Sequence, residues 1–376
     1  MRILMLGIKE YPYGVSAQFE NCVGGGTARE VIALSEELSK SGFCIDLIVR
    51  RMPGQKKFEV CAGVNIYRVF WFNNRYLRLP SFNLFSFFCA VKIIRKVDII
   101  HSHSAFSFLP GLILSKIFKK KSIGTNHGGP WPENGTYLSV AIKITRWLER
   151  LGLKYFKKFI FMSEAEKENL CKGYNITPEN YKIVNIGINP LSVKRKVTDN
   201  FKVVFVGRLI SRKGLDKFIL SYKELPDHLK GKILFIIVGD GFQREQLEQL
   251  TMTNELQEYV HFTGFTSQIE KYLEDASLCI LPSDGIEGLP SSMLEAMSVG
   301  IPCVISNFKA PVNDNCYIYL KDNEPVSIAR AIADAYFDRK KLALIGERAK
   351  KAFDERFSIN VVAKNFQAVY RESYVE

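Results

Sequence analysis

The sequence lacks any apolar run of the roughly 18 to 20 residues needed to cross a bilayer. The best candidate, 82–94, is broken by Lys92 and by Arg95 just after it, and the next, 106–118, contains Pro110 and Lys116. The N-terminal MRILMLG lacks the small-residue cleavage pattern of a signal peptide and predicts a buried first strand instead. We therefore expect a cytoplasmic protein without a membrane-spanning helix.

Closely spaced cysteine pairs are also missing. Eight cysteines are present, but no two form a C-x-x-C pair, and several lie in apolar, strand-like runs such as FCIDLIV and SLCIL. Such cysteines are typical of reduced, structural thiols in a reducing compartment. The cysteine pattern therefore supports the cytoplasmic location.

Acidic residues are scarce in the first half of the chain. Residues 1–190 contain 27 Lys and Arg against 14 Asp and Glu, a net charge of +13, whereas residues 191–376 contain 25 of each kind. This excess indicates an anionic partner. No nucleic-acid-binding motif accompanies it, so we expect no nucleic acid; anionic lipid headgroups or a lipid diphosphate fit the Phe-rich stretch 82–94 better. A solvated basic face without a specific partner is the alternative.

Short apolar runs alternate with segments of helical period, a pattern typical of parallel strands buried between helices. Six such runs precede residue 190 and five follow it, and the polar stretch 189–200 separates the two series. The pattern predicts an α/β fold with two doubly wound, Rossmann-like domains, 1–190 and 191–376. A last helix from Asn360 could pack back on the first domain. Such sheets bind ligands at the carboxyl ends of the strands, where the strand order reverses.

One informative stretch, SDGIEGLPSSMLEAMSVGIPCVIS (283–306), combines a glycine-punctuated loop with a helix that begins near Ser291. Backbone N–H groups at a helix N-terminus can bind a diphosphate without a metal ion. Glu287 precedes this helix and Glu295 lies within it. Carboxylates at these positions can accept hydrogen bonds from sugar or ribose hydroxyls.

In a second stretch, VVFVGRLISRKGLDKF (203–218), two cationic residues follow a predicted buried strand. Arg208 provides a guanidinium and Lys213 an ammonium, and Gly214 closes the loop. Two such cations suit a diphosphate, because the guanidinium forms paired hydrogen bonds with oxyanions and the ammonium acts as a point charge. A plain solvated loop would explain this motif alone. The glutamate pair later in the chain favours the diphosphate.

Together these motifs resemble the retaining glycosyltransferases of GT-B fold, specifically glycosyltransferase family 4 (glycosyl transferases group 1). The resemblance extends over almost the whole chain, and its most specific part, EGLPSSMLEAMSVGIPCV (287–304), is similar to the family's paired-glutamate motif. The other matching segments are GGGT (24–27), DIIHSHS (98–104), TNHGG (125–129), FMSEAEKENL (161–170), IVNIGIN (183–189), FVGRLISRKG (205–214), IVGDGFQREQLEQL (237–250) and VHFTGF (260–265).

The resemblance implies an acceptor-binding N-terminal domain, a nucleotide-sugar-binding C-terminal domain and a reaction in the cleft between them. Arg208 and Lys213 would neutralise the diphosphate leaving group. Glu295 would hold the donor ribose, and Glu287 would lie near the transferred sugar and phosphates. His127 would contact the sugar beside the anomeric carbon, although a lone histidine after a strand is more often structural.

The resemblance implies further donor-binding residues, namely Gly25, Gly26, Gly264, Phe265, Leu289 and Ser291. Gly25 and Gly26 would let the donor and acceptor approach the backbone, although an ordinary strand-to-helix turn would also use glycine. The backbone at Gly264 and Phe265 would seat the base. Two other histidines, His101 and His103, are expected to be mainly structural.

Two features bear on the shape and chemistry of the donor site. Where the family commonly has a Gly-Gly-x-x-Glu turn, this chain reads NFKAPVNDN (307–315), so that wall of the site is expected to differ. No D-x-D metal motif is present, which agrees with a metal-independent reaction in which cations and helix amides replace the metal. We expect no cofactor and no metal, with a UDP- or GDP-linked sugar as substrate.

The implied function is retaining transfer of a hexose-type sugar to a glycan or lipid-linked acceptor in the synthesis of cell-envelope polysaccharides or glycoconjugates. The enzyme would contact the anionic inner face of the membrane peripherally through its basic N-terminal domain. Two alternatives stay open: a non-catalytic GT-B subunit that binds a nucleotide sugar, and a sugar-nucleotide epimerase of the same fold. The intact Arg208, Lys213 and glutamate pair argue against the first.

Overall fold

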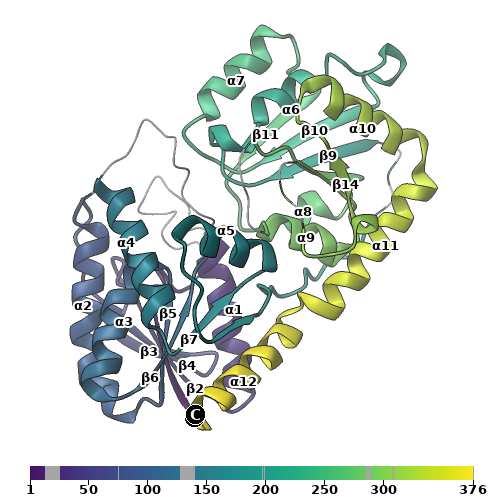
Figure 1. The fold of residues 1–376 in the computed structure, drawn as a ribbon. Helices are drawn as coiled ribbons and strands as arrows, with labels where there is room; N and C mark the ends of the chain where they lie inside the picture. Colours follow the sequence, from purple (N-terminus) through teal and green to yellow (C-terminus); the bar gives the residue numbers. More distant parts are fainter. Residues whose placement is uncertain are drawn as a thin grey trace. The chain divides into compact units, whose positions relative to one another are not determined.

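The chain folds into two compact units, Met1–Gly187 with Ile359–Glu376, and Ile188–Ser358 (Figure 1). The structure is a computed structural model that describes residues 1–12, 26–74, 76–127, 140–196, 198, 200–284, 289–306, 308 and 310–375. The first unit includes the last helix of the chain, and the polar stretch 189–200 belongs to the second unit.

The first unit is built on an eight-stranded sheet of order β3-β4-β2-β1-β5-β6-β7-β8. Only the β3–β4 pair is antiparallel among the strand pairs of the described chain. The strand order reverses between β1 and β5. The strands are β1 (Arg2–Leu6), β2 (Cys44–Arg50), β3 (Phe58–Cys61), β4 (Val64–Val69), β5 (Ile99–His103), β6 (Lys121–Thr125), β7 (Lys158–Phe161) and β8 (Tyr181–Ile183).

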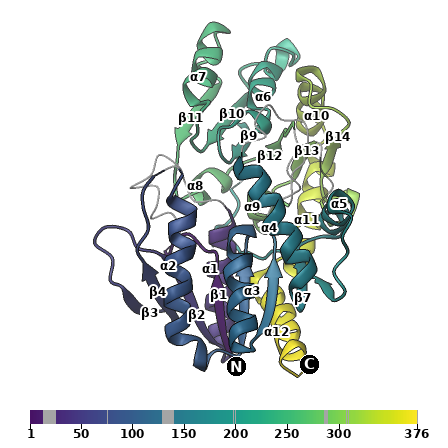
Figure 2. The same ribbon diagram turned by 60° about the vertical axis from the view of Figure 1, so that its left-hand side comes forward.

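Helices cover both faces of this sheet (Figure 2). Alternate residues of β1 point to opposite faces: Ile3 and Met5 pack with α1 and α12, whereas Leu4 and Leu6 pack with α2 and α3. A further apolar cluster joins α3, α4 and α5. The helices are α1 (Gly26–Lys40), α2 (Arg78–Ile93), η2 (Ile94–Lys96), α3 (Ala105–Phe118), α4 (Val140–Tyr155), α5 (Glu164–Tyr174) and α12 (Ile359–Val375).

The second unit is built on a six-stranded parallel sheet of order β11-β10-β9-β12-β13-β14, the strand order of a Rossmann dinucleotide-binding sheet. Its strands are β9 (Phe201–Val206), β10 (Ile233–Val238), β11 (Val260–Gly264), β12 (Leu278–Leu281), β13 (Cys303–Ser306) and β14 (Ile318–Leu320). Its helices are η3 (Ser211–Lys213), α6 (Leu215–Ser221), η4 (Asp227–Leu229), α7 (Arg244–Thr253), α8 (Glu270–Leu273), α9 (Ser291–Val299), η5 (Asp314–Cys316), α10 (Pro325–Phe337) and α11 (Arg339–Arg356).

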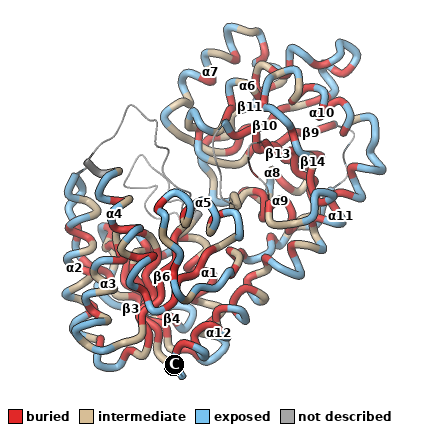
Figure 3. The backbone as a smooth tube through the Cα atoms, in the orientation of Figure 1, coloured by how far each residue is buried: buried red, intermediate tan, exposed pale blue. Residues whose placement is uncertain are grey.

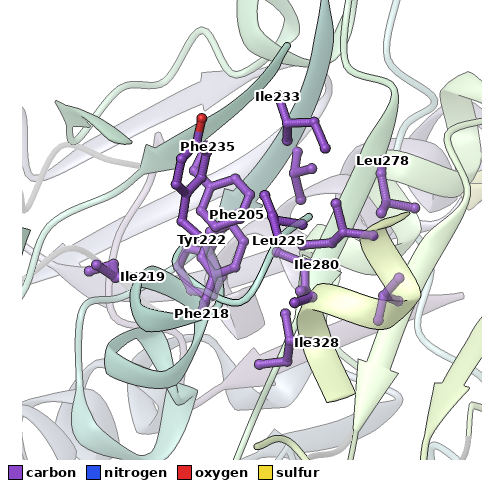
Figure 4. Packing of buried hydrophobic residues seen from close by; sticks show 14 of the residues in the cluster. Phe205, Phe218, Ile219, Tyr222, Leu225, Ile233, Phe235, Leu278, Ile280 and Ile328 are labelled. Atoms are coloured by element: carbon purple, nitrogen blue, oxygen red, sulfur yellow. The ribbon is translucent and has the colours of Figure 1, made fainter. Parts of the chain in front are cut away.

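Aliphatic and aromatic residues together fill the core of the second unit between its sheet and helices α6 and α10 (Figure 4). The rings of Phe218 on α6 and Phe235 on β10 are stacked with centroids 4.2 Å apart. Tyr222 packs edge-on against Phe235, and Ile328 closes the cluster from α10. This packing holds α6 against the sheet, just after the loop that follows β9.

The two apolar runs that charges interrupt in the sequence fold as helices of the first unit. They correspond to α2 and α3, and Pro110 lies inside α3. Over the described residues, no helix combines the length and the apolar character that crossing a membrane requires.

A buried carboxyl group caps the start of α5. The hydroxyl of Ser163 accepts a hydrogen bond from the Glu166 backbone N–H at 3.1 Å, and Glu166 Oε2 accepts one from the Met162 backbone N–H at 2.6 Å. The arrangement is similar to a capping box, except that the glutamate bonds the residue before the N-cap, Ser163. Burial raises the pKa of Glu166 to about 8, and the nearby carboxylates of Glu149 and Glu30 add to the shift.

We expect Glu166→Gln to remove a pH-dependent loss of stability. The folded chain keeps a proton on Glu166 that the unfolded chain releases above its ordinary pKa of 4.5. The free energy of unfolding should therefore fall as pH rises toward about 8, by on the order of 1 kcal/mol per pH unit from this group. Urea unfolding at several pH values should show the variant gaining on the wild type over that interval. Glu168→Gln, at an exposed position of the same helix, is the control; curves for Glu166→Gln parallel to wild type would refute the assignment.

Candidate active site

The loop that carries Arg208 and Lys213 leaves the carboxyl end of β9. Backbone N–H groups of Gly207 and Leu209 donate to the carbonyls of Val238 and Asp240, each at 3.0 Å. These bonds fix the loop against the end of β10. Arg208 is exposed at this edge, and Lys213 is half-buried at the end of η3.

This loop contacts the segment that follows β12. The Asp284 backbone N–H donates to the Arg212 carbonyl at 2.9 Å. Gly214 has a φ of +63°, and a methyl carbon at this position would lie 2.0 Å from the Pro282 carbonyl oxygen. Since β9 and β12 are the neighbours at which the strand order reverses, the backbone beside the two cations is joined to the backbone that leads toward Glu287.

A polar network holds the segment after β12. Lys217 Nζ on α6 donates to Asp284 Oδ1 at 2.9 Å and to Asn323 Oδ1 at 3.1 Å. Asn323 Nδ2 donates to the Pro282 carbonyl at 3.0 Å and to Asp284 Oδ1 at 2.7 Å. Burial raises the pKa of Asp284, but the hydrogen bonds from Asn323 and Lys217 outweigh it and leave that pKa below its ordinary value. A carboxylate therefore anchors this segment.

We expect Lys217→Met to lower turnover about tenfold, because a loosened segment misplaces the groups at the site even though Lys217 touches no substrate. Lys217→Arg should restore most of the rate, since a guanidinium can donate to the same oxygens. Lys230→Met removes an exposed lysine paired with Asp227 in the same unit and serves as the control. Steady-state kinetics with melting temperatures would check this, and wild-type turnover in Lys217→Met would contradict it.

Helix α9 begins at Ser291, as the sequence predicts, and carries Glu295 in its second turn. Glu295 is 3% exposed, and Leu289 and Ser291 are half-buried at the helix start. Glu287 and Gly25 lie outside the described residues, and Gly26 is the first residue of α1.

The backbone predicted to bind the nucleotide base, at Gly264 and Phe265, lies at the end of β11. Gly264 accepts a hydrogen bond from the Gly239 backbone N–H at 3.0 Å, and Phe265 is exposed beside it. Arg244, bonded to Asp240 at 3.0 Å and to Glu248 at 2.8 Å, covers Gly264. Gly264 and Arg208 thus share the carboxyl edge of one sheet, with β10 between their strands.

The first unit has a buried polar cluster at its own strand reversal, where β5 ends. His101 Nδ1 lies 2.7 Å from the Tyr370 hydroxyl, and its Nε2 lies 2.7 Å from Thr125 Oγ1. Burial, with a contribution from His127, lowers the pKa of His101 to about 3. His101 is therefore neutral and joins β5 to β6 and α12.

His127 is held between two protein groups. Its Nε2 lies 3.0 Å from His103 Nδ1, and its Nδ1 lies 3.4 Å from Glu30 Oε2 on α1. Burial, with the neighbouring imidazoles, lowers the pKa of His103 well below its ordinary value. The sequence motifs do not include Glu30, although its position one turn after GGGT places it near the ligand-binding edge. His103, expected to be mainly structural, lies in contact with His127.

Two family models match consecutive parts of the chain. The model described as Glycosyltransferase Family 4 matches residues 24–190, and the model described as Glycosyl transferases group 1 matches residues 191–352. This chain belongs to the group 1, family 4 glycosyltransferases. The predicted family and the predicted enzyme class, a glycosyltransferase, are confirmed.

Relatives of this glycosyltransferase include an uncharacterized glycosyltransferase of Methanocaldococcus jannaschii, 27% identical over 95% of this chain and 97% of that protein. The UDP-Gal:alpha-D-GlcNAc-diphosphoundecaprenol alpha-1,3-galactosyltransferase of Escherichia coli is 28% identical over 59% of this chain and 60% of its own length. The crystal structure of Anabaena Alr3699/HepE in complex with UDP and glucose has a TM-score of 0.78 with 19% identity, over 99% of this chain and all of that one. The GT-B fold class predicted from the sequence is confirmed.

Proposed function

We propose that this glycosyltransferase moves a hexose-type sugar from a UDP- or GDP-linked donor to a glycan or lipid-linked acceptor, with retention of configuration. One observation carries the proposal: the loop with Arg208 and Lys213 is bonded to the segment before Glu287, at the strand reversal of a Rossmann sheet. Ligands of such sheets bind at this position, and the two cations suit a diphosphate.

In the proposed reaction, the bond between the anomeric carbon and the diphosphate oxygen breaks through an oxocarbenium-like state. Arg208, Lys213 and the amides that begin α9 stabilise the negative charge of the departing nucleoside diphosphate. The acceptor hydroxyl forms the new bond from the same face and gives its proton to a diphosphate oxygen. The products are the glycoside and the nucleoside diphosphate, and no metal or cofactor takes part in this scheme.

The donor assignment draws support from a structural neighbour crystallised with UDP and glucose, and the acceptor assignment from a relative named for a diphosphoundecaprenol acceptor. We place the acceptor on the first unit, at the β1–β5 reversal where Glu30, His103 and His127 meet. His127 would turn toward the transferred sugar when both substrates are bound. The enzyme would work on the inner face of the membrane, in the synthesis of envelope glycans or glycoconjugates.

A thermal-shift screen against UDP, GDP, ADP and their common sugars tests the donor class, since a ligand that binds the native state raises its stability. A uridine or guanosine diphosphate sugar should give the largest rise in melting temperature. No shift with any of these nucleotides would refute the proposal.

Product analysis separates the proposed reaction from its two alternatives. With the donor found in the screen and an acceptor glycan, NMR of the product should show the same anomeric configuration as the donor. An inverted product would refute retention. Donor binding without transfer or donor hydrolysis would indicate a non-catalytic subunit, and an epimerised nucleotide sugar would indicate an epimerase.

A further inference from the structure

The outer side of α2 is apolar as well as its inner side. Leu84, Phe88 and Val91 are exposed, and their spacings of four and three residues place them on one side of the helix. Phe82 and Ala90 are buried in the core on the other side. Phe88 keeps 56% of its surface exposed. A helix that faces only water normally carries polar residues on its outer side.

The neighbouring helix α3 repeats this arrangement. Leu109, Ile113 and Ile117 are exposed and follow one another at intervals of four residues. Ile117 keeps 62% of its surface exposed. Phe108 and Leu114 are fully buried on the inner side. The outer side of α3 is therefore a second apolar stripe.

The two stripes lie on neighbouring helices, because α2 and α3 lie side by side in contact (Figure 2), and turns of both helices are coloured as exposed in Figure 3. We name this surface the α2–α3 face; its members are Leu84, Phe88, Val91, Leu109, Ile113 and Ile117. Monomeric proteins rarely expose so contiguous an apolar surface unless it binds a partner or a membrane.

The charges around the α2–α3 face are almost all positive. From the first residue of α2, Arg78, to Lys121 just after α3, the chain has eight Lys and Arg residues and one acidic residue, Asp98. The carboxylate of Asp98 accepts a hydrogen bond from the Arg2 backbone N–H at 2.7 Å. Lys92 near the end of α2 and Lys116 within the α3 stripe are exposed. The partner of this face must therefore be both apolar and anionic.

We propose that the α2–α3 face lies flat on an anionic bilayer, with its apolar side chains among the lipid headgroups and its lysines beside the lipid phosphates. An interfacial helix binds a membrane through this combination of an inserted apolar side and flanking cations. A second copy of the chain is a poorer partner, because it would bring the same lysines into opposition. Binding to a bilayer would bring the enzyme to the lipid-linked acceptor on which the proposed function rests, but vesicle binding itself requires no sugar transfer.

Co-sedimentation of the full chain with vesicles tests this proposal. We expect the protein to pellet with vesicles of phosphatidylcholine and phosphatidylglycerol and much less with phosphatidylcholine alone. Phe88→Ser with Ile117→Ser should weaken binding on the order of tenfold or more, because two inserted apolar side chains are lost. Replacing one lysine, as in Lys116→Gln, should weaken it about fivefold. Phe337→Ser removes a phenylalanine of similar exposure, 63%, from the second unit and should bind like wild type.

Melting temperatures and transfer to a water-soluble acceptor, measured without vesicles, show whether each variant is folded and active. Variants that stay folded and active but lose vesicle binding would support the proposal. Equal pelleting of wild type and variants, or no pelleting of wild type with anionic vesicles, would overturn it. A wild-type dimer that Phe88→Ser with Ile117→Ser dissociates would assign the face to a second copy instead. Vesicle binding without transfer would leave this proposal standing and remove the proposed function.

Discussion

Arg208→Ala and Lys213→Ala should each lower turnover on the order of several hundredfold, the effect of removing one positioned donor from a developing charge. Arg208 follows β9 and is exposed at the edge of the sheet. Lys213 is the last residue of the short helix η3, which packs against Pro282 and Asp284. The charge they are proposed to stabilise grows as the diphosphate departs. The loss should therefore appear mainly in kcat and less in the donor KM.

Lys223→Ala is the control for this pair, because it removes an exposed lysine of the same unit, one that contacts Asn254. It should leave kcat within about twofold of wild type, as expected for an exposed side chain away from the site. Single-turnover rates would show whether the chemical step is affected. Near-wild-type kcat in both Arg208→Ala and Lys213→Ala would end the assignment of these residues to the leaving group.

Gly214→Ala should damage both activity and stability, because the loop depends on a residue without a side chain at this position. The left-handed backbone alone costs a non-glycine residue about 1–2 kcal/mol. The added methyl would also lie 2.0 Å from the Pro282 carbonyl oxygen, so the loop must move away from the segment after β12. A displacement of about 1 Å can lower the rate on the order of 100-fold.

Gly231→Ala provides a matched control for Gly214→Ala. Gly231 has a φ of +83°, and its added methyl would contact nothing within 4 Å. It should therefore show the backbone cost without the clash, with a free energy of unfolding lowered by about 1–2 kcal/mol and turnover unchanged. Chemical unfolding and kcat for both variants would separate the two effects. Equal turnover in the two variants would mean that the contact at Pro282 does not position the site.

The sequence predicts the architecture well because each buried parallel strand is a continuous apolar run. All eleven predicted runs contain a strand of the structure. The strands it misses are β3, β8 and β14, which have three or four residues each and lie at sheet edges. β3 and β8 are largely exposed. Strands of three or four residues with so few buried positions leave no apolar run long enough to detect.

The residues of the candidate site also divide into those that the sequence predicts and those that only the fold brings together. Arg208 and Lys213 could be predicted because both lie on one short loop beside a buried strand. Lys217 and Asn323 could not, because they are 106 positions apart, and the packing of α6 against α10, which begins just after Asn323, brings them to Asp284. Glu30 could not be predicted, because a single glutamate on an amphipathic helix has no distinguishing sequence pattern. Only the folded structure shows that it lies beside His127.

The most direct test of the central claim compares a nucleoside diphosphate with its nucleoside by isothermal titration calorimetry. If Arg208 and Lys213 hold the diphosphate, wild type should bind UDP or GDP far more tightly than uridine or guanosine. The double variant Arg208→Ala with Lys213→Ala should bind the diphosphate and the nucleoside almost equally. A double variant that keeps the wild-type preference for the diphosphate would contradict the claim.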